Sequence, residues 1–129
     1  MSDKTNFQKI IDFHHEFGLD SHTTPNPNVY TENPKLVKLR WDLISEEVDE
    51  LKQALDEHDF VETVDALTDI LYVVYGAATS FGVDIDKAYD IVHKSNMSKL
   101  CETEELAQKT VEQYRKWFKE GKTPYDTPT

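Results

Sequence analysis

Apolar residues recur along this chain at the three- and four-residue spacings of amphipathic helices, and no stretch shows strand-like alternation followed by a hairpin signal. Asn33 and Pro34 form a typical helix start, with Asn as the N-cap and Pro at the first helical position. The segment 20–33 is rich in Pro, Asn and Thr and is predicted to be a loop. The apolar pattern predicts helices over residues 3–17, 34–57, 60–81, 85–94 and 104–118.

The most apolar part of the chain lies in the third predicted helix, where the run from Ile70 to Ala78 is apolar on all sides. Such a helix is buried by other helices of its own chain or of a partner chain. Short connections after residue 57 favour antiparallel neighbours. The expected fold is therefore all-α, with one domain over residues 1–129 built as an antiparallel helical bundle of about five helices around a four-helix core. Five helices are too few to cover the third one completely, so we expect an oligomer.

The charge balance is strongly acidic, with 14 Lys and Arg against 25 Asp and Glu and a formal net charge of −11. This excess repels phosphate backbones and anionic membrane surfaces, so we expect no nucleic acid and no membrane as partners. The nine residues from Ile70 to Ala78 are also far fewer than the roughly 20 that span a bilayer. Cys101 is the single cysteine, which excludes an internal disulfide and suits a reducing, cytoplasmic location. A phosphate-bearing ligand would need a divalent cation to neutralise it.

Two acids of the 34–57 helix lie on one side of the helical wheel. At about 100° per residue, Glu47 and Glu50 fall near −60° and −120° from Ile44, on one flank of the expected core direction. Glu46 and Asp49 point away from the core and are expected to face solvent. The residues taken to mark the core direction are Ile44, Val48, Leu51 and Leu55.

A polar stripe at spacings of 3, 4 and 3 follows on the next helix. It consists of Glu62, Asp65, Asp69 and Tyr72. Asp69 directly precedes the apolar run, so an ionised carboxylate there needs a partner. If this stripe faces Glu47 and Glu50, four or five oxygens surround one small volume, which favours Mg²⁺, with Mn²⁺ as a second choice. The alternative is that these acids are solvated, with Glu62 as the capping-box acid of its helix and Asp65 paired with a lysine.

The acids described above belong to two of three segments that follow one another in order. These are residues 43–51 (LISEEVDEL), 65–76 (DALTDILYVVYG) and 95–100 (SNMSKL). Together they resemble the motifs of the all-α nucleoside triphosphate pyrophosphatases. That superfamily includes MazG-like enzymes, the all-α dUTPases and dCTPases, and phosphoribosyl-ATP pyrophosphatase. The resemblance covers residues 36–100. It implies a helical bundle, assembled as a homodimer or homotetramer, in which acidic motifs on two helices bind Mg²⁺.

The match to these motifs is close, with one departure. The Glu-x-x-Glu pair at residues 47–50 matches the first acidic motif, and Asp69 matches the final Asp of the second. The resemblance implies a Glu three residues before that Asp, where this chain has Ala66. Asp65 or Glu62 would therefore have to serve as the missing ligand.

The activity implied is Mg²⁺-dependent hydrolysis of a nucleoside triphosphate, either a dNTP or a non-standard NTP, to the monophosphate and pyrophosphate. Glu47 or Glu50 is the predicted catalytic residue that takes the proton of the attacking water. Two alternatives remain open. One is phosphoribosyl-ATP hydrolysis, and the other is a non-catalytic helical interaction module whose apolar third helix binds a partner.

Substrate contacts are predicted just past the fourth helix. Lys99 can contact a phosphate as a point charge, and the Asn96 amide has the paired donor and acceptor that suit a base or ribose edge. Trp41 is a further candidate for the base pocket, over which the loop 20–33 could close. For Trp41, packing or surface exposure is the simpler role.

The remaining notable residues are basic. His14 and His15 could help to shape the base pocket, but packing or exposure is the simpler role and no zinc-site spacing accompanies them. Lys35, Lys38 and Arg40 cluster at the start of the second helix. We expect a solvated helix face there, with a phosphate-side role as the alternative.

Overall fold

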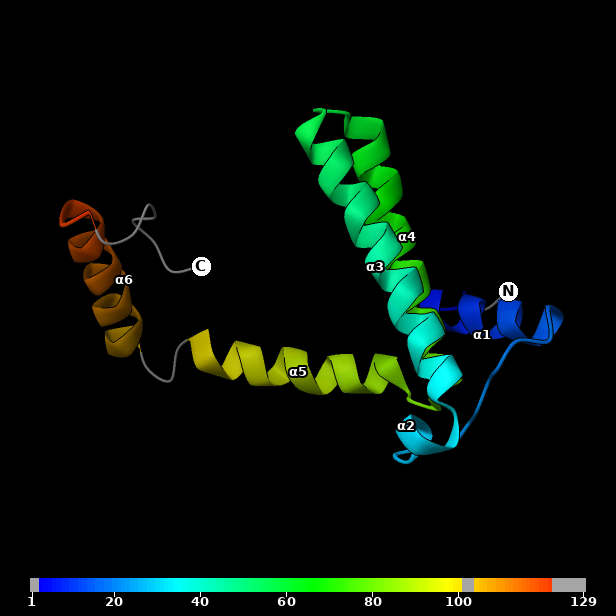
Figure 1. Ribbon diagram of the computed structural model, residues 1–129. Coiled ribbons are helices and arrows are strands. Elements are labelled where there is room, and N and C mark those ends of the chain that lie inside the picture. The colour runs from blue at the N-terminus through cyan, green and yellow to red at the C-terminus, as the bar shows by residue number, and fades with distance from the viewer. Residues whose placement is uncertain (1–2, 101–103, 122–129) are drawn as a thin grey trace. The chain divides into compact units, whose positions relative to one another are not determined.

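Six α-helices make up the computed structural model, which describes residues 3–100 and 104–121 (Figure 1). No strand occurs within these two ranges, so the all-α prediction is confirmed there. In chain order the helices are α1 (Asn6–Glu16), α2 (Val29–Glu32), α3 (Pro34–Asp56), α4 (Phe60–Ser80), α5 (Ile85–Leu100) and α6 (Glu104–Lys119).

The chain divides into two compact units, residues 1–86 and residues 87–129. The first unit holds α1 to α4 and the start of α5, and within it α4 packs against both α3 and α1. The second unit holds the rest of α5 and α6. The four-helix core, the bundle arrangement, the single domain and the oligomer stay predictions.

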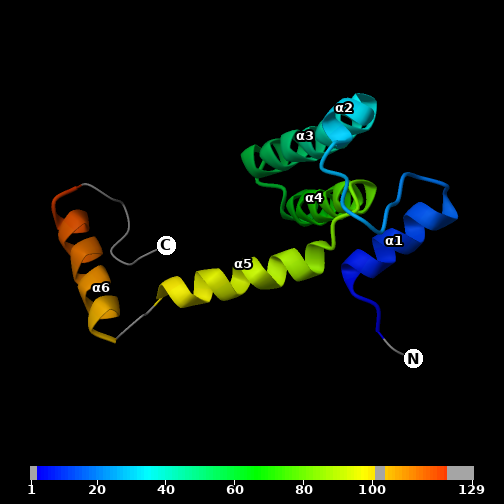
Figure 2. The same ribbon diagram turned by 90° about the horizontal axis from the view of Figure 1, so that it is seen from below.

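The antiparallel pair of α3 and α4 forms the centre of the first unit, and both views show the two helices side by side (Figure 1, Figure 2). The Asn33 side chain caps α3 by accepting a hydrogen bond of 3.3 Å from the N–H of Leu36, as predicted. In the connection His58 adopts a φ of 55°, and the N–H of Asp59 donates to the carbonyl of Ala54 at 3.0 Å. This tight turn sends the chain straight back along α3.

The side of α3 that packs on α4 is rotated from the predicted one. Its buried residues are Leu36, Arg40 and Ala54. With Ile44 at zero on the wheel, these positions centre near about −60°, which is the direction of Glu47. Val48 and Leu55 are 48% and 52% exposed, so their assignment to the core direction is wrong for the isolated chain. The apolar pattern misplaced the packing face because polar residues occupy part of it.

Burial of α4 is concentrated in its C-terminal part, where Gly76 to Ser80 are all buried, and Ala66 is the one buried residue before that part. Leu71 is 53% exposed, so the expectation of an apolar run buried on most sides holds only in part for the isolated chain. No single helix in the described ranges is long and apolar enough to cross a membrane, and α4 and α5 meet this requirement of length and composition only together, as a bent pair.

Helix α1 lies against α4 (Figure 2). Aromatic side chains form part of this contact. The ring centroids of Phe7 and Tyr75 are 6.0 Å apart, and those of Phe13 and Tyr72 are 5.6 Å apart in an edge-to-face arrangement. These contacts hold α1, which carries His14, against the C-terminal half of α4.

The segment after α1 is tied to the C-terminal end of α4. The Ser80 hydroxyl donates to the carbonyl of Asp20 at 3.1 Å, and the N–H of His22 donates to the carbonyl of Thr79 at 3.0 Å. Gly82 has a φ of 75°, and a Cβ at this position would lie 1.9 Å from the carbonyl oxygen of Thr24. Glycine is therefore required both by the backbone angle and by the close approach.

Two predicted boundaries are wrong. The segment 20–33 contains the short helix α2, because Val29 is buried where α2 contacts α3 and fixes one helical turn. Helix α5 continues to Leu100 instead of ending near residue 94, since no Gly or Pro interrupts it. Asn96 and Lys99 therefore lie within a helix, not just past one.

The cap of α3 gives a first prediction. Asn33→Ala removes the side-chain hydrogen bond to the N–H of Leu36 and should lower the free energy of unfolding by about 1 kcal/mol. The matched control is Asn28→Ala, because Asn28 is the N-cap of α2 but its side chain makes no capping hydrogen bond. Urea unfolding followed by far-UV circular dichroism measures both. Equal losses in the two variants would contradict a specific role for the Asn33 cap.

Candidate metal centre

Helices α3 and α4 bring three of the predicted ligands together. Glu47, Glu50 and Asp69 each offer a carboxylate oxygen, and these oxygens all lie within 4.8 Å of one another. The antiparallel pairing produces this arrangement, because Glu47 and Glu50 are one turn apart on α3 and Asp69 faces them from α4. Three carboxylates at this spacing suit a hard divalent cation.

One oxygen of this cluster is buried without a partner. Oε2 of Glu47 is shielded from solvent and accepts no hydrogen bond. Glu47 and Asp69 are both half-buried, whereas Glu50 is exposed. A buried carboxylate oxygen with no donor is unfavourable, so a bound cation would remove a defect that is visible in the fold.

The electrostatics of the cluster favour protonation as long as no cation is bound. Partial burial raises the pKa of Glu47 above its usual range, and the hydrogen bond and negative charge of Glu50 raise it further. Burial also raises the pKa of Asp69, and the neighbouring charge and hydrogen bond of Asp65 raise it further. Asp65 is thus in contact with the cluster through Asp69, which is consistent with its prediction as an additional ligand.

No basic side chain neutralises these acids in the part of the chain that the structure describes. Four ion pairs between exposed side chains involve none of these acids: Lys4–Asp12, Lys38–Asp42, Lys52–Asp56 and Lys94–Asp90. The donor set consists of carboxylates alone, without His or Cys, and therefore fits Mg²⁺ or Mn²⁺ better than zinc.

A groove of about 240 Å³ adjoins the cluster on the side of the α3–α4 connection. It is lined by Glu50, Gln53, Ala54, Glu57, Glu62, Asp65 and Ala66. The N–H of Glu62 donates to the Asp59 side chain at 3.1 Å, so Asp59 acts as the N-cap of α4. The N–H of Asp59 already donates to the carbonyl of Ala54. The Glu62 side chain therefore does not make the second hydrogen bond of the predicted capping box, which would join it to that N–H.

The buried Ala66 lines this groove together with Glu50, at the position where the resemblance implies a Glu. Glu62 and Asp65 are the acids of α4 that line the same groove. Both of the substitutes suggested from the sequence are therefore next to the cluster, and their role as ligands stays a prediction.

The predicted substrate contacts are divided between the two units. Asn96 and Lys99 are exposed residues of α5, in the part of that helix that belongs to the second unit. Trp41 is 64% exposed on α3. The structure does not bring any of the three together with the acidic cluster within one unit, and their contact with substrate stays a prediction.

The prediction for the basic cluster is wrong at one of its three members. Lys35 and Lys38 are exposed, but Arg40 is only 7% exposed and faces α4. His14 is buried as well, in agreement with a packing role, while His15 is exposed. Arg40 precedes Glu47 by seven residues, which is two helical turns, so this spacing was the signal that placed both on one face.

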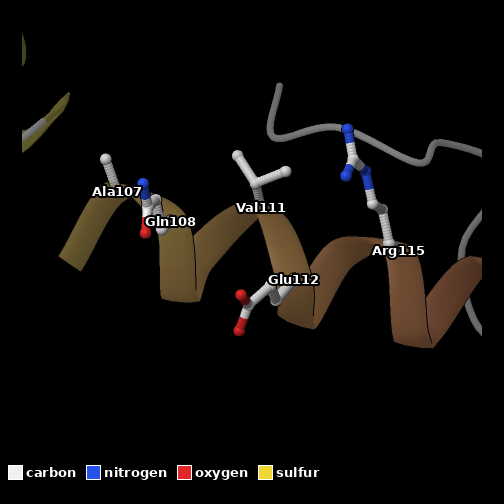
Figure 3. Close-up of a pocket in the computed structure, with 5 residues that line it drawn as sticks. All are labelled: Ala107, Gln108, Val111, Glu112 and Arg115. Atoms are coloured by element: carbon white, nitrogen blue, oxygen red, sulfur yellow. The ribbon is translucent and has the colours of Figure 1, made fainter. Parts of the chain in front are cut away.

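A shallow depression runs along α6 in the second unit and is lined by Ala107, Gln108, Val111, Glu112 and Arg115 (Figure 3). All five residues come from this one helix, and Val111 and Arg115 point to the same side of it. One helix face does not enclose a ligand, so the acidic cluster is the better candidate for the functional site.

Comparison with known proteins agrees with this choice. Residues 10–96 match the phosphoribosyl-ATP pyrophosphohydrolase family. The chain belongs to this family. The family is part of the all-α nucleoside triphosphate pyrophosphatase superfamily, so the resemblance seen in the sequence is confirmed. The match includes α3, α4 and all the acids of the cluster.

Over 82 residues, the chain is also 46% identical to an uncharacterised protein of Acanthamoeba polyphaga mimivirus. The aligned part covers 64% of this chain and 33% of that protein, so the chain spans about a third of its relative's length. The matched family is one of pyrophosphohydrolases, enzymes that act on phosphoric anhydride bonds and typically use a divalent metal.

The raised pKa values give a second prediction. Above these pKa values the folded, metal-free protein is destabilised by its ionised cluster, and lowering the pH toward the ordinary values of 4.5 and 3.8 for Glu47 and Asp69 relieves this. Mg²⁺ binds the ionised carboxylates, so its stabilising effect should be full at pH 8 and should shrink as the pH falls to 5.

Thermal melts at both pH values, with EDTA or with millimolar Mg²⁺, test this coupling. In Asp69→Asn the rise in Tm with Mg²⁺ should be lost at pH 8, whereas Asp49→Asn, an exposed residue of α3 outside the cluster, should keep it. An Mg²⁺ effect of equal size at both pH values would speak against cation binding by these carboxylates.

Proposed function

We propose that this protein hydrolyses a nucleoside triphosphate, a dNTP or a non-standard NTP, to the monophosphate and pyrophosphate with Mg²⁺ as cofactor. The observation that carries the proposal is the buried, unpartnered Oε2 of Glu47 beside Glu50 and Asp69. It indicates a site that is completed by a cation. Family membership supplies the reaction type, which is cleavage of a phosphoric anhydride.

The three acids of the cluster differ in exposure, which supports different roles for them. Glu47 and Asp69 are half-buried and would hold the cation, with Asp65 next to Asp69 as a further negative charge. Glu50 is exposed, so its carboxylate can reach a water molecule and accept the proton during attack on the phosphorus. The bound Mg²⁺ would supply neutralisation of the phosphate charge and orientation of the water.

A nucleotide panel tests this proposal. The purified chain is incubated with Mg²⁺ and individual NTPs and dNTPs, and pyrophosphate release is measured. Glu50→Ala and Asp69→Asn should lower kcat by at least about a hundredfold, because they remove a proton acceptor and a ligand. Asp49→Asn should retain the wild-type rate. Pyrophosphate release that is no higher than in Glu50→Ala would refute the proposal.

Phosphoribosyl-ATP hydrolysis is the second candidate activity, since the matching family carries that name. Including phosphoribosyl-ATP in the panel decides between the two. A kcat/KM for phosphoribosyl-ATP well above that for every NTP and dNTP would establish it as the substrate.

We also propose that the chain forms a homo-oligomer, as a dimer or a tetramer. A stripe on the side of α4 opposite α3 leaves apolar side chains exposed at spacings of 4, 3 and 4. It consists of Phe60, Val64, Leu67 and Leu71, which are 79%, 49%, 49% and 53% exposed. An apolar stripe of this length is typical of a helix that packs on a partner.

Sedimentation tests the assembly. The wild-type chain should sediment well above its monomer mass of 15.0 kDa, and Leu67→Lys should shift it toward the monomer. Lys52→Glu, a substitution at an exposed residue of α3, should leave the mass unchanged. A wild-type monomer would contradict the proposed oligomer.

A further inference from the structure

A second unsatisfied polar group lies in the same helix pair as the acidic cluster and carries the opposite charge. Arg40 is only 7% exposed, and its Nε is buried without a hydrogen-bond partner. Among the described residues no carboxylate forms an ion pair with it. Asp20 acts on it only as a charge at a distance, and burial lowers the pKa of Arg40. Such a guanidinium lacks the anion that normally accompanies a buried Arg.

The surroundings of Arg40 hold the guanidinium in place without neutralising it. A Cβ on Gly76 would lie 3.0 Å from Nη1 of Arg40 and 3.3 Å from Nε2 of His14, so both groups converge on the bare backbone of α4. The carbonyl of Asp20 can only accept, so Nδ1 of His14 donates to it at 2.8 Å. Burial lowers the pKa of His14, which favours the neutral ring with no proton on Nε2. His14 is therefore a neutral neighbour and not a counter-ion.

The helix register links this group to the metal centre. Asp69 faces Glu47, and Gly76 faces Arg40, so seven residues back along α3 correspond to seven residues forward along α4. Seven residues are about two turns and about 10 Å of helix. The negatively charged cluster and the positively charged Arg40 guanidinium thus lie in the same helix interface but are too far apart to neutralise each other.

We propose that Arg40 binds a phosphoryl group of the substrate at the α3–α4 interface, two helical turns from the Glu47–Glu50–Asp69 cluster. The inference rests on the proposed function for its substrate class. A guanidinium binds phosphate through paired N–H donors. The ligand must therefore have one part that is bound at the acidic cluster and a negatively charged phosphate that reaches Arg40. Two sources share this chemistry, the terminal phosphate of a triphosphate and the separate 5′-phosphate of a phosphoribosyl-ATP.

Calorimetric binding of nucleotide analogues that cannot be cleaved tests the assignment without relying on turnover. With Mg²⁺ present, Arg40→Met should raise the Kd of α,β-methylene-ATP by about tenfold or more, since a charge-assisted contact is lost. Its Mg²⁺ affinity should match the wild type, and its Tm should not fall, because Met removes an unpaired buried charge. Lys38→Gln is the matched control, since Lys38 lies two residues away but is exposed and paired with Asp42.

Two further variants keep the test decisive if Arg40→Met folds poorly. Arg40→Lys keeps the charge and should recover part of the affinity. Gly76→Ala keeps the Arg but places a Cβ against Nη1, so it should weaken analogue binding while leaving Mg²⁺ affinity unchanged. Wild-type affinity in both Arg40→Met and Gly76→Ala, or in Gly76→Ala alone where Arg40→Met is unfolded, would overturn the proposal.

Comparing analogues distinguishes the two sources of phosphate. If Arg40 binds the terminal phosphate, the wild type should prefer α,β-methylene-ATP over α,β-methylene-ADP, and Arg40→Met should lose that preference. If it binds the phosphoribosyl phosphate, the substitution should weaken only the phosphoribosyl form of the ATP analogue. A wild-type chain that binds these analogues through Arg40 but releases no pyrophosphate would refute the proposed function alone. Normal turnover with unchanged binding in Arg40→Met would refute this inference alone.

Discussion

The antiparallel register of α3 and α4 is the constraint on which the rest of this structure depends. It sets Asp69 against Glu47 and Gly76 against Arg40, and it leaves neither the acidic cluster nor the guanidinium with a partner of opposite charge. A shift by one turn along either helix would separate these groups and allow each to be solvated. The tight turn at His58, with the cap at Asp59, fixes this register locally.

Ordinary stability would not select such an arrangement. Three carboxylates within 4.8 Å of one another repel, and burial of one Glu47 oxygen adds a desolvation penalty. A glycine inside α4, at Gly76, weakens that helix by about 1 kcal/mol relative to alanine. Local departures from stability of this kind are typical of functional sites, where the rest of the fold compensates for them. Here the compensation comes from the aromatic contacts between α1 and α4 and from the tied loop after α1.

Much of this site could be predicted from the sequence because its members repeat at helical spacing. Glu47, Glu50 and Asp69 stand out once the acids are sorted by helix face, and Asn33 with Pro34 marks the start of α3. Arg40 was missed for a physical reason: the core direction was read from apolar residues alone, whereas the packing face centres on Glu47 and is partly polar. The full length of α5 and the turn at α2 were missed because tertiary contacts, and the lack of a breaker, outweigh weak local signals.

The charges of the interface now give the net charge of −11 a more specific meaning. If the acids of α3 and α4 served only solubility, Arg40 would be expected to pair with one of them, since both signs are present on the same helix face and the chain has 25 acids to choose from. Instead, the cation and the acids are held about two turns apart, and each is left unsatisfied. A simple anion would be repelled by the cluster, and a simple cation would do nothing for Arg40. A phosphate-bearing ligand that arrives with its own divalent cation satisfies both groups at once, which is why a metal-bound nucleotide matches this interface better than either ion alone.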